Sequence, residues 1–220
     1  MDKRLRRERL CRGHLYLVCD DRPDEFLSAV LGAGVEIVQL RMKSGSDEEI
    51  IEIARRFARA CAAHEALFIL NDRPDLVLAA GADGVHVGQD DTAAAQARAI
   101  VGTERLVGLS THDPQQIDAA NHAGVDYIGV GPVHETPTKP GRPAVGLELV
   151  CYAAAQARIP FFAIGGIDAG NLSTVRAAGA RRVAVVRALT QAADPGRAAC
   201  ELRSELPSAR GSAEVPVGAS

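Results

Sequence analysis

The sequence predicts a single parallel (β/α)8 barrel of the TIM type, and three observations support this fold class. Eight short runs rich in Val, Ile and Leu recur along the chain, as expected of strands buried on both faces. Ala-rich segments with helical spacing separate these runs. The length of 220 residues suits one barrel domain. If one strand is miscounted, the alternative is an open doubly wound sheet.

The predicted strands are spaced so that a helix fits between each pair. In chain order they are HLYLVC (14–19), VEIVQL (35–40), LFIL (67–70), GVHVG (84–88), LVGLS (106–110), DYIGV (126–130), FFAIG (161–165) and RVAVV (182–186). A helix is expected to begin near Asp47, with its apolar residues on one side. These apolar residues are Ile50, Ile51, Ile53, Ala54 and Phe57. The glycines at predicted helix C-caps are Gly32, Gly34, Gly81, Gly124 and Gly179.

The two ends of the chain differ in character. The basic start, MDKRLRRERL, lacks the apolar stretch of a signal peptide and is interpreted either as an exposed arm or as a short helix packed under the barrel. The barrel domain is expected to span residues 1–206. Residues 207–220 are rich in Ser, Ala, Pro and Gly without apolar periodicity, so we expect a disordered tail there.

The composition argues against several classes of partner. A net charge of -3 favours neither nucleic acid nor an anionic membrane, and no apolar run reaches the roughly 18 residues of a membrane span. We expect small phosphorylated substrates as partners, in the cytoplasm, and the oligomeric state stays open, a homo-oligomer included. The cysteines form no C-x-x-C pair and are interpreted as reduced, small buried hydrophobes. They are Cys11, Cys19, Cys61, Cys151 and Cys200.

Polar side chains with a common direction follow the second strand. In QLRMK, the alternating positions Gln39, Arg41 and Lys43 point to one side of an extended chain. An Arg and a Lys aimed at one place suit a phosphate or pyrophosphate. The alternative interpretation is a solvated strand end.

Carboxylates follow the third and fourth strands. Asn71 and Asp72 end the third, and Asp90 and Asp91 end the fourth. Two Asp side chains at adjacent strand ends are typical of a Mg²⁺ site that substrate oxygens and water complete. The structural alternative is that these residues only cap the helices that follow, the first of which Pro74 would open.

The remaining strand ends add hydroxyls, a lysine and glycines. Ser110, Thr111 and His112 follow the fifth strand as candidate donors, with His112 interpreted as a loop histidine. A long loop after the sixth strand offers Thr136, Thr138 and Lys139, with Gly131 permitting close approach. Gly165 and Gly166 follow the seventh strand, where barrels often bind phosphate. The sequence therefore predicts two phosphate sites on one mouth.

The motifs QLRMK, NDRPD, HVGQDD, GLSTH, GVGPVHETPTK and AIGGI occur in this order and resemble the thiamine phosphate synthase family, from about His14 to Ala188. The resemblance implies an aminohydroxymethylpyrimidine diphosphate and a thiazole phosphate as substrates, with Mg²⁺. It implies pyrimidine-diphosphate contacts for Gln39, Arg41, Lys43, Asn71, Ser110 and Lys139. Among these it makes Arg41, Lys43, Ser110 and Lys139 catalytic. It implies Mg²⁺ ligation by Asp72 and Asp91. It implies a thiazole phosphate site at Thr136, Thr138, Gly166, Val186 and Arg187.

One departure from the family pattern lies at the eighth strand. The family usually has a Val-Ile-Ser-like sequence there, whereas this chain has Arg187, preceded by Arg181 and Arg182. Arg187 either binds the thiazole phosphate directly or crowds it. Two other functions stay open: a thiazole tautomerase on a similar barrel, and a non-catalytic barrel that binds a phosphorylated ligand.

Overall fold

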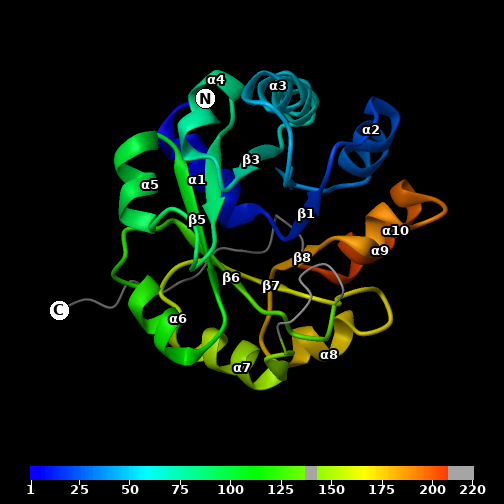
Figure 1. Cartoon of the computed structure of the whole chain (residues 1–220). Helices are drawn as coiled ribbons and strands as arrows, with labels where there is room; N and C mark the ends of the chain where they lie inside the picture. The colour runs from blue at the N-terminus through cyan, green and yellow to red at the C-terminus, as the bar shows by residue number, and fades with distance from the viewer. Residues whose placement is uncertain (137–142, 208–220) are drawn as a thin grey trace.

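A computed structural model describes residues 1–136 and 143–207, and it confirms the predicted barrel. Eight parallel strands pair in sequence order, and β1 closes the sheet against β8. Figure 1 shows β8 and β1, the last and first strands, side by side inside a ring of helices. The strands are β1 (Leu15–Cys19), β2 (Ile37–Leu40), β3 (Leu67–Asn71), β4 (Gly84–Val87), β5 (Leu106–Thr111), β6 (Tyr127–Val130), β7 (Phe161–Ile164) and β8 (Val183–Val185).

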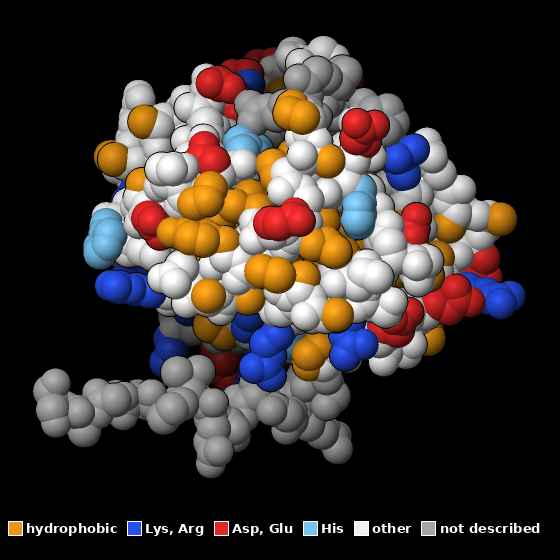
Figure 2. All heavy atoms as spheres, turned by 90° about the horizontal axis from the view of Figure 1, so that it is seen from below, with side chains coloured by type: hydrophobic (Ala, Val, Ile, Leu, Met, Phe, Trp, Pro, Cys, Tyr) orange, Lys and Arg blue, Asp and Glu red, His pale blue; other side chains and the backbone are white. Residues whose placement is uncertain are grey.

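Helices alternate with these strands along the chain. They are α1 (Lys3–Arg12), α2 (Asp24–Gly32), α3 (Asp47–Ala63), the 3₁₀ turn η1 (Pro74–Leu76), α4 (Val77–Ala80), α5 (Ala94–Val101), α6 (Pro114–Ala120), α7 (Gly146–Gln156), α8 (Leu172–Ala177), α9 (Arg187–Thr190) and α10 (Pro195–Glu205). The face formed by α6, α7 and α8, seen from below, carries apolar side chains with charged groups between them (Figure 2). None of the large exposed hydrophobic residues among the described ones belongs to these three helices.

The strands are buried on both faces, which explains their near-continuous apolar sequences. Their outward side chains pack against the helices in one large cluster, which includes Leu17, Val38 and Phe68. Their inward side chains fill the barrel. This inner cluster comprises Leu10 of the N-terminal helix and the strand residues Tyr16, Val18, Ile37, Leu67, Ile69, Leu106, Tyr127, Phe162 and Ala184. The interior is therefore packed at its base, and a cavity is left only toward one end.

The basic N-terminal segment forms α1 and seals the base of the barrel. Leu10 belongs to the inner cluster and is 2% exposed. The Arg6 Nε donates to Asp83 at 2.9 Å, and the side chains of the pair are 5% and 13% exposed. Arg7 donates to Asp126 through two nitrogen atoms, at 2.9 and 2.7 Å. Of the two interpretations of this segment, the packed helix is therefore the right one.

Helix α3 illustrates how the outer ring is specified. Ser46 caps it by accepting a hydrogen bond from the Glu49 backbone. The acidic residues in its first turn stabilise the helix through their interaction with the positive end of its dipole. Its buried residues Ile50, Ala54, Phe57 and Cys61 recur at helical spacing. Ile51 and Ile53 are half-buried against the same core, so the predicted amphipathic helix is confirmed.

Some predictions of local detail need correction. Cys19 and Cys61 are buried, but Cys11, Cys151 and Cys200 are exposed, so only two of the five behave as buried hydrophobes. Each lies on a helix surface, where the side-chain direction follows the helical turn. The predicted disordered tail falls, from residue 208 on, outside the described residues. Within the described ranges, no helix is both long and apolar enough for a membrane crossing.

The buried Arg6–Asp83 pair generates a stability prediction. Arg6→Ala leaves the Asp83 carboxylate buried without its cation, which we expect to lower the free energy of unfolding by about 3–5 kcal/mol. Urea unfolding followed by circular dichroism measures this loss. Arg12→Ala is the matched control, since Arg12 makes an exposed pair with Glu8 and its removal should cost under about 1 kcal/mol. Equal effects in the two variants would contradict a sealing role for α1.

Candidate active site

A cavity of about 340 Å³ opens among the carboxyl ends of the strands. Its lining residues come from every strand and from the loops after β2, β5, β6, β7 and β8. Eight of the predicted substrate-binding residues line it: Gln39, Arg41, Asn71, Ser110, Thr136, Gly166, Val186 and Arg187. The structure thus gathers on one surface residues that lie up to 148 positions apart, from 39 to 187.

Other predicted residues lie elsewhere. Lys43 is exposed in a bend and is not among the residues that line the cavity. The alternation predicted for Gln39, Arg41 and Lys43 assumed an extended chain, whereas β2 ends at Leu40. The contact of Lys43 with a diphosphate stays a prediction. Thr138 and Lys139 lie outside the described residues.

The two candidate donors beside Ser110 have separate roles. Ser110 faces the cavity, whereas Thr111 is fully buried and donates to the Gly129 carbonyl at 3.1 Å. His112 lines the cavity with its Nδ1 hydrogen-bonded to the Gly131 carbonyl. Because successive residues of a strand point to opposite faces, only Ser110 of β5 serves as an inward hydroxyl.

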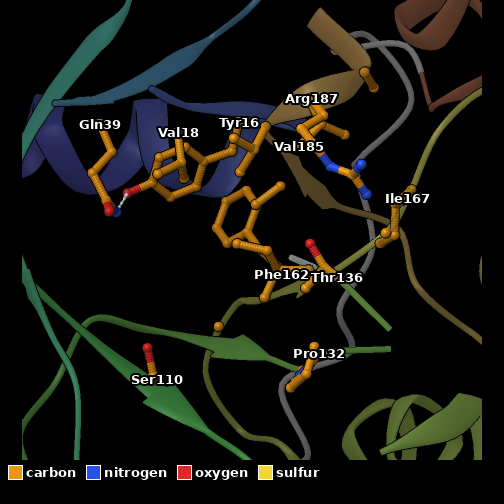
Figure 3. A pocket seen from close by; sticks show the side chains of 18 of the residues that line it. Tyr16, Val18, Gln39, Ser110, Pro132, Thr136, Phe162, Ile167, Val185 and Arg187 are labelled. Carbon is orange, nitrogen blue, oxygen red and sulfur yellow. Dashed lines mark hydrogen bonds between the residues drawn. The ribbon is translucent and has the colours of Figure 1, made fainter. Parts of the chain in front are cut away.

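The cavity has two ends with different chemistry. Figure 3 shows Gln39 and Ser110 at one end, called the first end below, and Arg187 with Ile167 at the other, the second end. Phe162 lies between them as an apolar floor. The arrangement suits a ligand, or a pair of ligands, with polar groups at both ends and an apolar middle.

At the second end, the loop after β7 packs closely on the loop after β6. Gly166 has a φ of +63°, and a Cβ there would lie 2.8 Å from the His134 Cβ. The His134 backbone donates to the Gly165 carbonyl at 3.0 Å. The two glycines thus allow the loops after β6 and β7 to pack closely, and their predicted contact with a phosphate stays a prediction.

Asp72 and Asp91 meet at the rim of the first end. The two carboxyl groups lie close enough for Asp91 to affect the pKa of Asp72. Burial and the neighbouring Asp91 charge raise the pKa of Asp72 to about 6, against smaller opposing effects of Asn71 and Arg41. The Asp91 carboxylate also accepts a hydrogen bond from the Gly88 backbone at 2.9 Å. The pair is therefore two carboxylates whose charges repel each other.

The capping alternative for these residues does not hold. Helix α5 has Ala93 at its N-cap, without a side-chain hydrogen bond, and η1 has Arg73 in that position. Asp72 instead adopts a left-handed backbone with φ of +60°, which Asp tolerates better than most residues. Asn71 donates from its amide to the Asp72 carboxylate. The backbone conformation and the Asn71 contact therefore fix the position of the Asp72 carboxylate without its capping a helix.

The donor set fits a divalent cation held jointly with a ligand. Residues 1–136 and 143–207 hold no group of three or more His, Cys, Asp or Glu side chains arranged for a metal. Two carboxylates match the way Mg²⁺ binds, since that ion keeps several waters and takes further oxygens from a phosphorylated ligand.

A chain of hydrogen bonds crosses the floor of the cavity. Gln39 Nε2 donates to Tyr16 Oη at 2.7 Å, and Tyr16 Oη lies 2.9 Å from Tyr127 Oη. His86 Nδ1 lies 3.2 Å from Tyr127 Oη, and His86 Nε2 lies 3.0 Å from Ser110 Oγ. Five strands contribute one residue each to this chain. The dashed line in Figure 3 marks its first bond.

The sequence reasoning missed three members of this chain, Tyr16, Tyr127 and His86. These three residues lie within strands, whereas the candidate residues predicted from the sequence follow the strand ends. A usable signal was present, because Tyr and His are polar residues at inward positions of strands that are otherwise apolar.

The fold and the cavity together define a (β/α)8-barrel protein with a cavity at its mouth that is polar at both ends and apolar in the middle. A family model described as thiamine monophosphate synthase matches residues 15–189. The chain therefore belongs to the thiamine monophosphate synthase family, and the resemblance seen in the sequence from His14 to Ala188 is confirmed.

Relatives with the same description agree. The thiamine-phosphate synthase of Acidothermus cellulolyticus is 50% identical over 207 residues, covering 91% of this chain and 98% of that one. That of Nostoc punctiforme is 50% identical over 205 residues, but the chain spans only 58% of its length. The solved thiamine phosphate pyrophosphorylase from Pyrococcus furiosus has a TM-score of 0.82 at 31% identity, covering 90% of this chain and 96% of that one.

The carboxylate pair generates a pH-dependent stability prediction. The pKa of Asp72 is raised from 3.8 to about 6, so the folded state holds its proton more tightly than the unfolded state. The resulting penalty is absent below about pH 4 and is fully developed above about pH 6. In metal-free protein, Asp72→Asn should therefore raise the free energy of unfolding at pH 8 by about 1–2 kcal/mol, after allowance for partial exposure, and less at pH 5.

Urea unfolding in a chelator at pH 8 and pH 5 measures the difference. Asp75→Asn is the control. It should change the free energy of unfolding at pH 8 in the opposite direction, because the Arg73 guanidinium lowers the pKa of Asp75. If Asp72→Asn raises the free energy of unfolding equally at both pH values, the cause is the better fit of Asn to the left-handed backbone at this position. That result would contradict the electrostatic explanation.

Proposed function

We propose that the protein joins an aminopyrimidine methyl diphosphate to a thiazole phosphate, giving thiamine phosphate and diphosphate. The observation that carries this proposal is the two-ended cavity with a carboxylate pair at one rim, in a chain of the thiamine monophosphate synthase family. The pyrimidine diphosphate belongs at the end with Gln39, Arg41 and Ser110. The thiazole phosphate belongs at the end with Gly166 and Arg187.

The reaction is a substitution at the pyrimidine methylene. The bond from that carbon to the diphosphate oxygen breaks, and its electron pair leaves with the diphosphate. The resulting cation is stabilised by the electron-rich aminopyrimidine ring. The lone pair of the thiazole nitrogen then forms the new carbon–nitrogen bond. No proton needs to be removed by the protein, so the site requires no strong base.

The chain's own residues assist in three ways. Arg41 faces the first end of the cavity, where a guanidinium binds diphosphate oxygens and offsets their charge as they leave. Lys43 and Lys139 are proposed to add charge there, although only the first lies in the described part of the chain. Val18, Phe162 and Ile164 keep the centre of the cavity apolar, which excludes water that would capture the cation.

Asp72 and Asp91 are proposed as the Mg²⁺ ligands. When bound, Mg²⁺ supplies positive charge that stabilises the leaving diphosphate. The pKa of Asp72, raised by Asp91, supports this assignment because a bound cation would relieve the repulsion between the two carboxylates.

Two other functions make different demands on the site. A thiazole tautomerase needs no diphosphate or metal site, so the Asp72–Asp91 pair and the adjacent Arg41 favour the synthase. A non-catalytic barrel would bind a phosphorylated ligand without turnover. We further expect the protein to act in the cytoplasm on small phosphorylated molecules, without nucleic acid or membrane partners.

The synthase proposal predicts Mg²⁺-dependent product formation that requires Asp91. Chromatography should detect thiamine phosphate from the two substrates with Mg²⁺ and none in a chelator. Asp91→Ala should lower the rate at least about 100-fold, since charge stabilisation by the metal is lost. Circular dichroism should stay close to that of the unchanged chain, and the unfolding midpoint should not fall. Unfolding of this variant would favour a structural role, and ligand binding without any product would favour the non-catalytic barrel.

Arg187 generates a prediction for the second substrate. It lines the cavity where the family usually has a small hydroxyl residue. If Arg187 binds the thiazole phosphate directly, Arg187→Ala should raise the KM for that substrate about tenfold or more, because a charge-assisted hydrogen bond is worth about 1.5–3 kcal/mol. The KM for the pyrimidine diphosphate should not change. A lower KM for the thiazole phosphate would mean that Arg187 crowds the site.

A further inference from the structure

We propose that the hydrogen-bond chain Gln39–Tyr16–Tyr127–His86–Ser110 runs in one direction and sets which atoms the cavity presents to its ligand. In this arrangement the Gln39 carbonyl faces the cavity as an acceptor, and the Ser110 hydroxyl faces it as a donor. Tyr16, Tyr127 and His86 are positioning residues, because they act on the ligand through Gln39 and Ser110. The inference deepens the proposed function and rests on it for the identity of the ligand.

The direction follows from counting donors along the chain. The Gln39 amide nitrogen donates to Tyr16 Oη and cannot accept, and a buried hydroxyl proton needs an acceptor, so we assign the single proton of Tyr16 to the bond with Tyr127 Oη. Tyr127 then gives its own proton to His86 Nδ1. With Nδ1 as acceptor, the neutral ring carries its proton on Nε2 and donates it to Ser110 Oγ. The serine hydroxyl is left to donate away from the ring.

Both phenols keep the proton that this count assigns to them. Tyr16 and Tyr127 are 2% and 1% exposed. Burial raises the pKa of Tyr16 and raises that of Tyr127 well above its ordinary value, so neither ionises near neutral pH. Each therefore contributes one donor at every working pH.

The ligand of the proposed function requires the same direction. A diphosphate beside Ser110 offers only acceptor oxygens, so Ser110 must donate its proton to it. Ser110 then has no proton for His86, which must donate from Nε2. If the direction were reversed, Ser110 would donate to His86 and turn lone pairs toward an anion, which is repulsive.

The backbone is built to admit the central bond. Gly108 of β5 faces the interior, where an added Cβ would lie 2.2 Å from Tyr127 Cζ and 2.6 Å from His86 Nδ1. Any other residue would displace one of the two rings. The Tyr127–His86 contact thus depends on the absence of a side chain at position 108.

The direction has a consequence for specificity. A carbonyl acceptor at Gln39 favours a ring that presents a donor, such as an amino group. With an analogue that lacks this group, the Gln39 carbonyl has no hydrogen-bond partner. Reversal would present the amide nitrogen of Gln39 and favour a ring acceptor instead. The chain therefore couples recognition of the ring at Gln39 to recognition of the leaving group at Ser110.

Tyr127→Phe tests the proposal because it removes one hydroxyl and keeps the aromatic contacts with Tyr16 and Phe162. Nitrogen-15 NMR of labelled histidine, with His86 assigned from His86→Gln, should show the proton on Nε2 in the unchanged chain. In Tyr127→Phe the His86 signals should shift toward a mixture of the two neutral forms. This measurement needs no turnover, so it is independent of whether the protein is a synthase.

Kinetics supply the second measurement. The unchanged chain should prefer the aminopyrimidine diphosphate over its analogue without the amino group, and Tyr127→Phe should reduce this ratio of kcat/KM about tenfold. Tyr152→Phe is the matched control, since this tyrosine of α7 donates to Asp118 on the surface, and neither measurement should change. If Tyr127→Phe unfolds, Tyr16→Phe replaces it. A proton on Nδ1 in the unchanged chain, or His86 signals and a preference that Tyr127→Phe leaves intact, would overturn the proposal.

Discussion

The pairing of β1 with β8 is the constraint on which the rest of the structure depends. Leu15 pairs with Val183 and Leu17 with Val185, and this last ladder converts a sheet with two edges into a barrel with none. Closure brings the carboxyl ends of all eight strands to one mouth, and it leaves an interior that side chains must fill. The cavity, the carboxylate pair and the hydrogen-bond chain are all consequences of that geometry.

Much of the fold could be predicted from the sequence, because its determinants are local. A doubly buried strand such as β3 needs an apolar sequence, and α3 needs a cap and apolar residues at helical spacing. The first residue of β2 was harder to predict from the sequence. Glu36 was assigned to the strand, whereas its carboxylate accepts from the His14 and Leu15 backbones and pairs with Arg203, contacts that no local pattern reveals.

The site was partly predictable for a similar reason. Parallel strands end at one mouth, so polar residues after strands, such as Arg41 and Asp72, could be assigned to it from their positions alone. Lys43 could not be placed in this way, because its direction depends on where β2 ends. Tyr127 and His86 were missed because a polar residue inside a strand is informative only when the interior it faces is known.

The sealing of the barrel by α1 has a consequence for the order of folding during synthesis. The segment that forms α1 is synthesised before its ionic partners Asp83 and Asp126, which lie much further along the chain. The Arg6 guanidinium stays in water without its partner until Asp83 is made, and the Arg7 guanidinium does so until Asp126 is made. The base of the barrel is thus closed by a segment that is made before the two strand-flanking carboxylates that hold it in place.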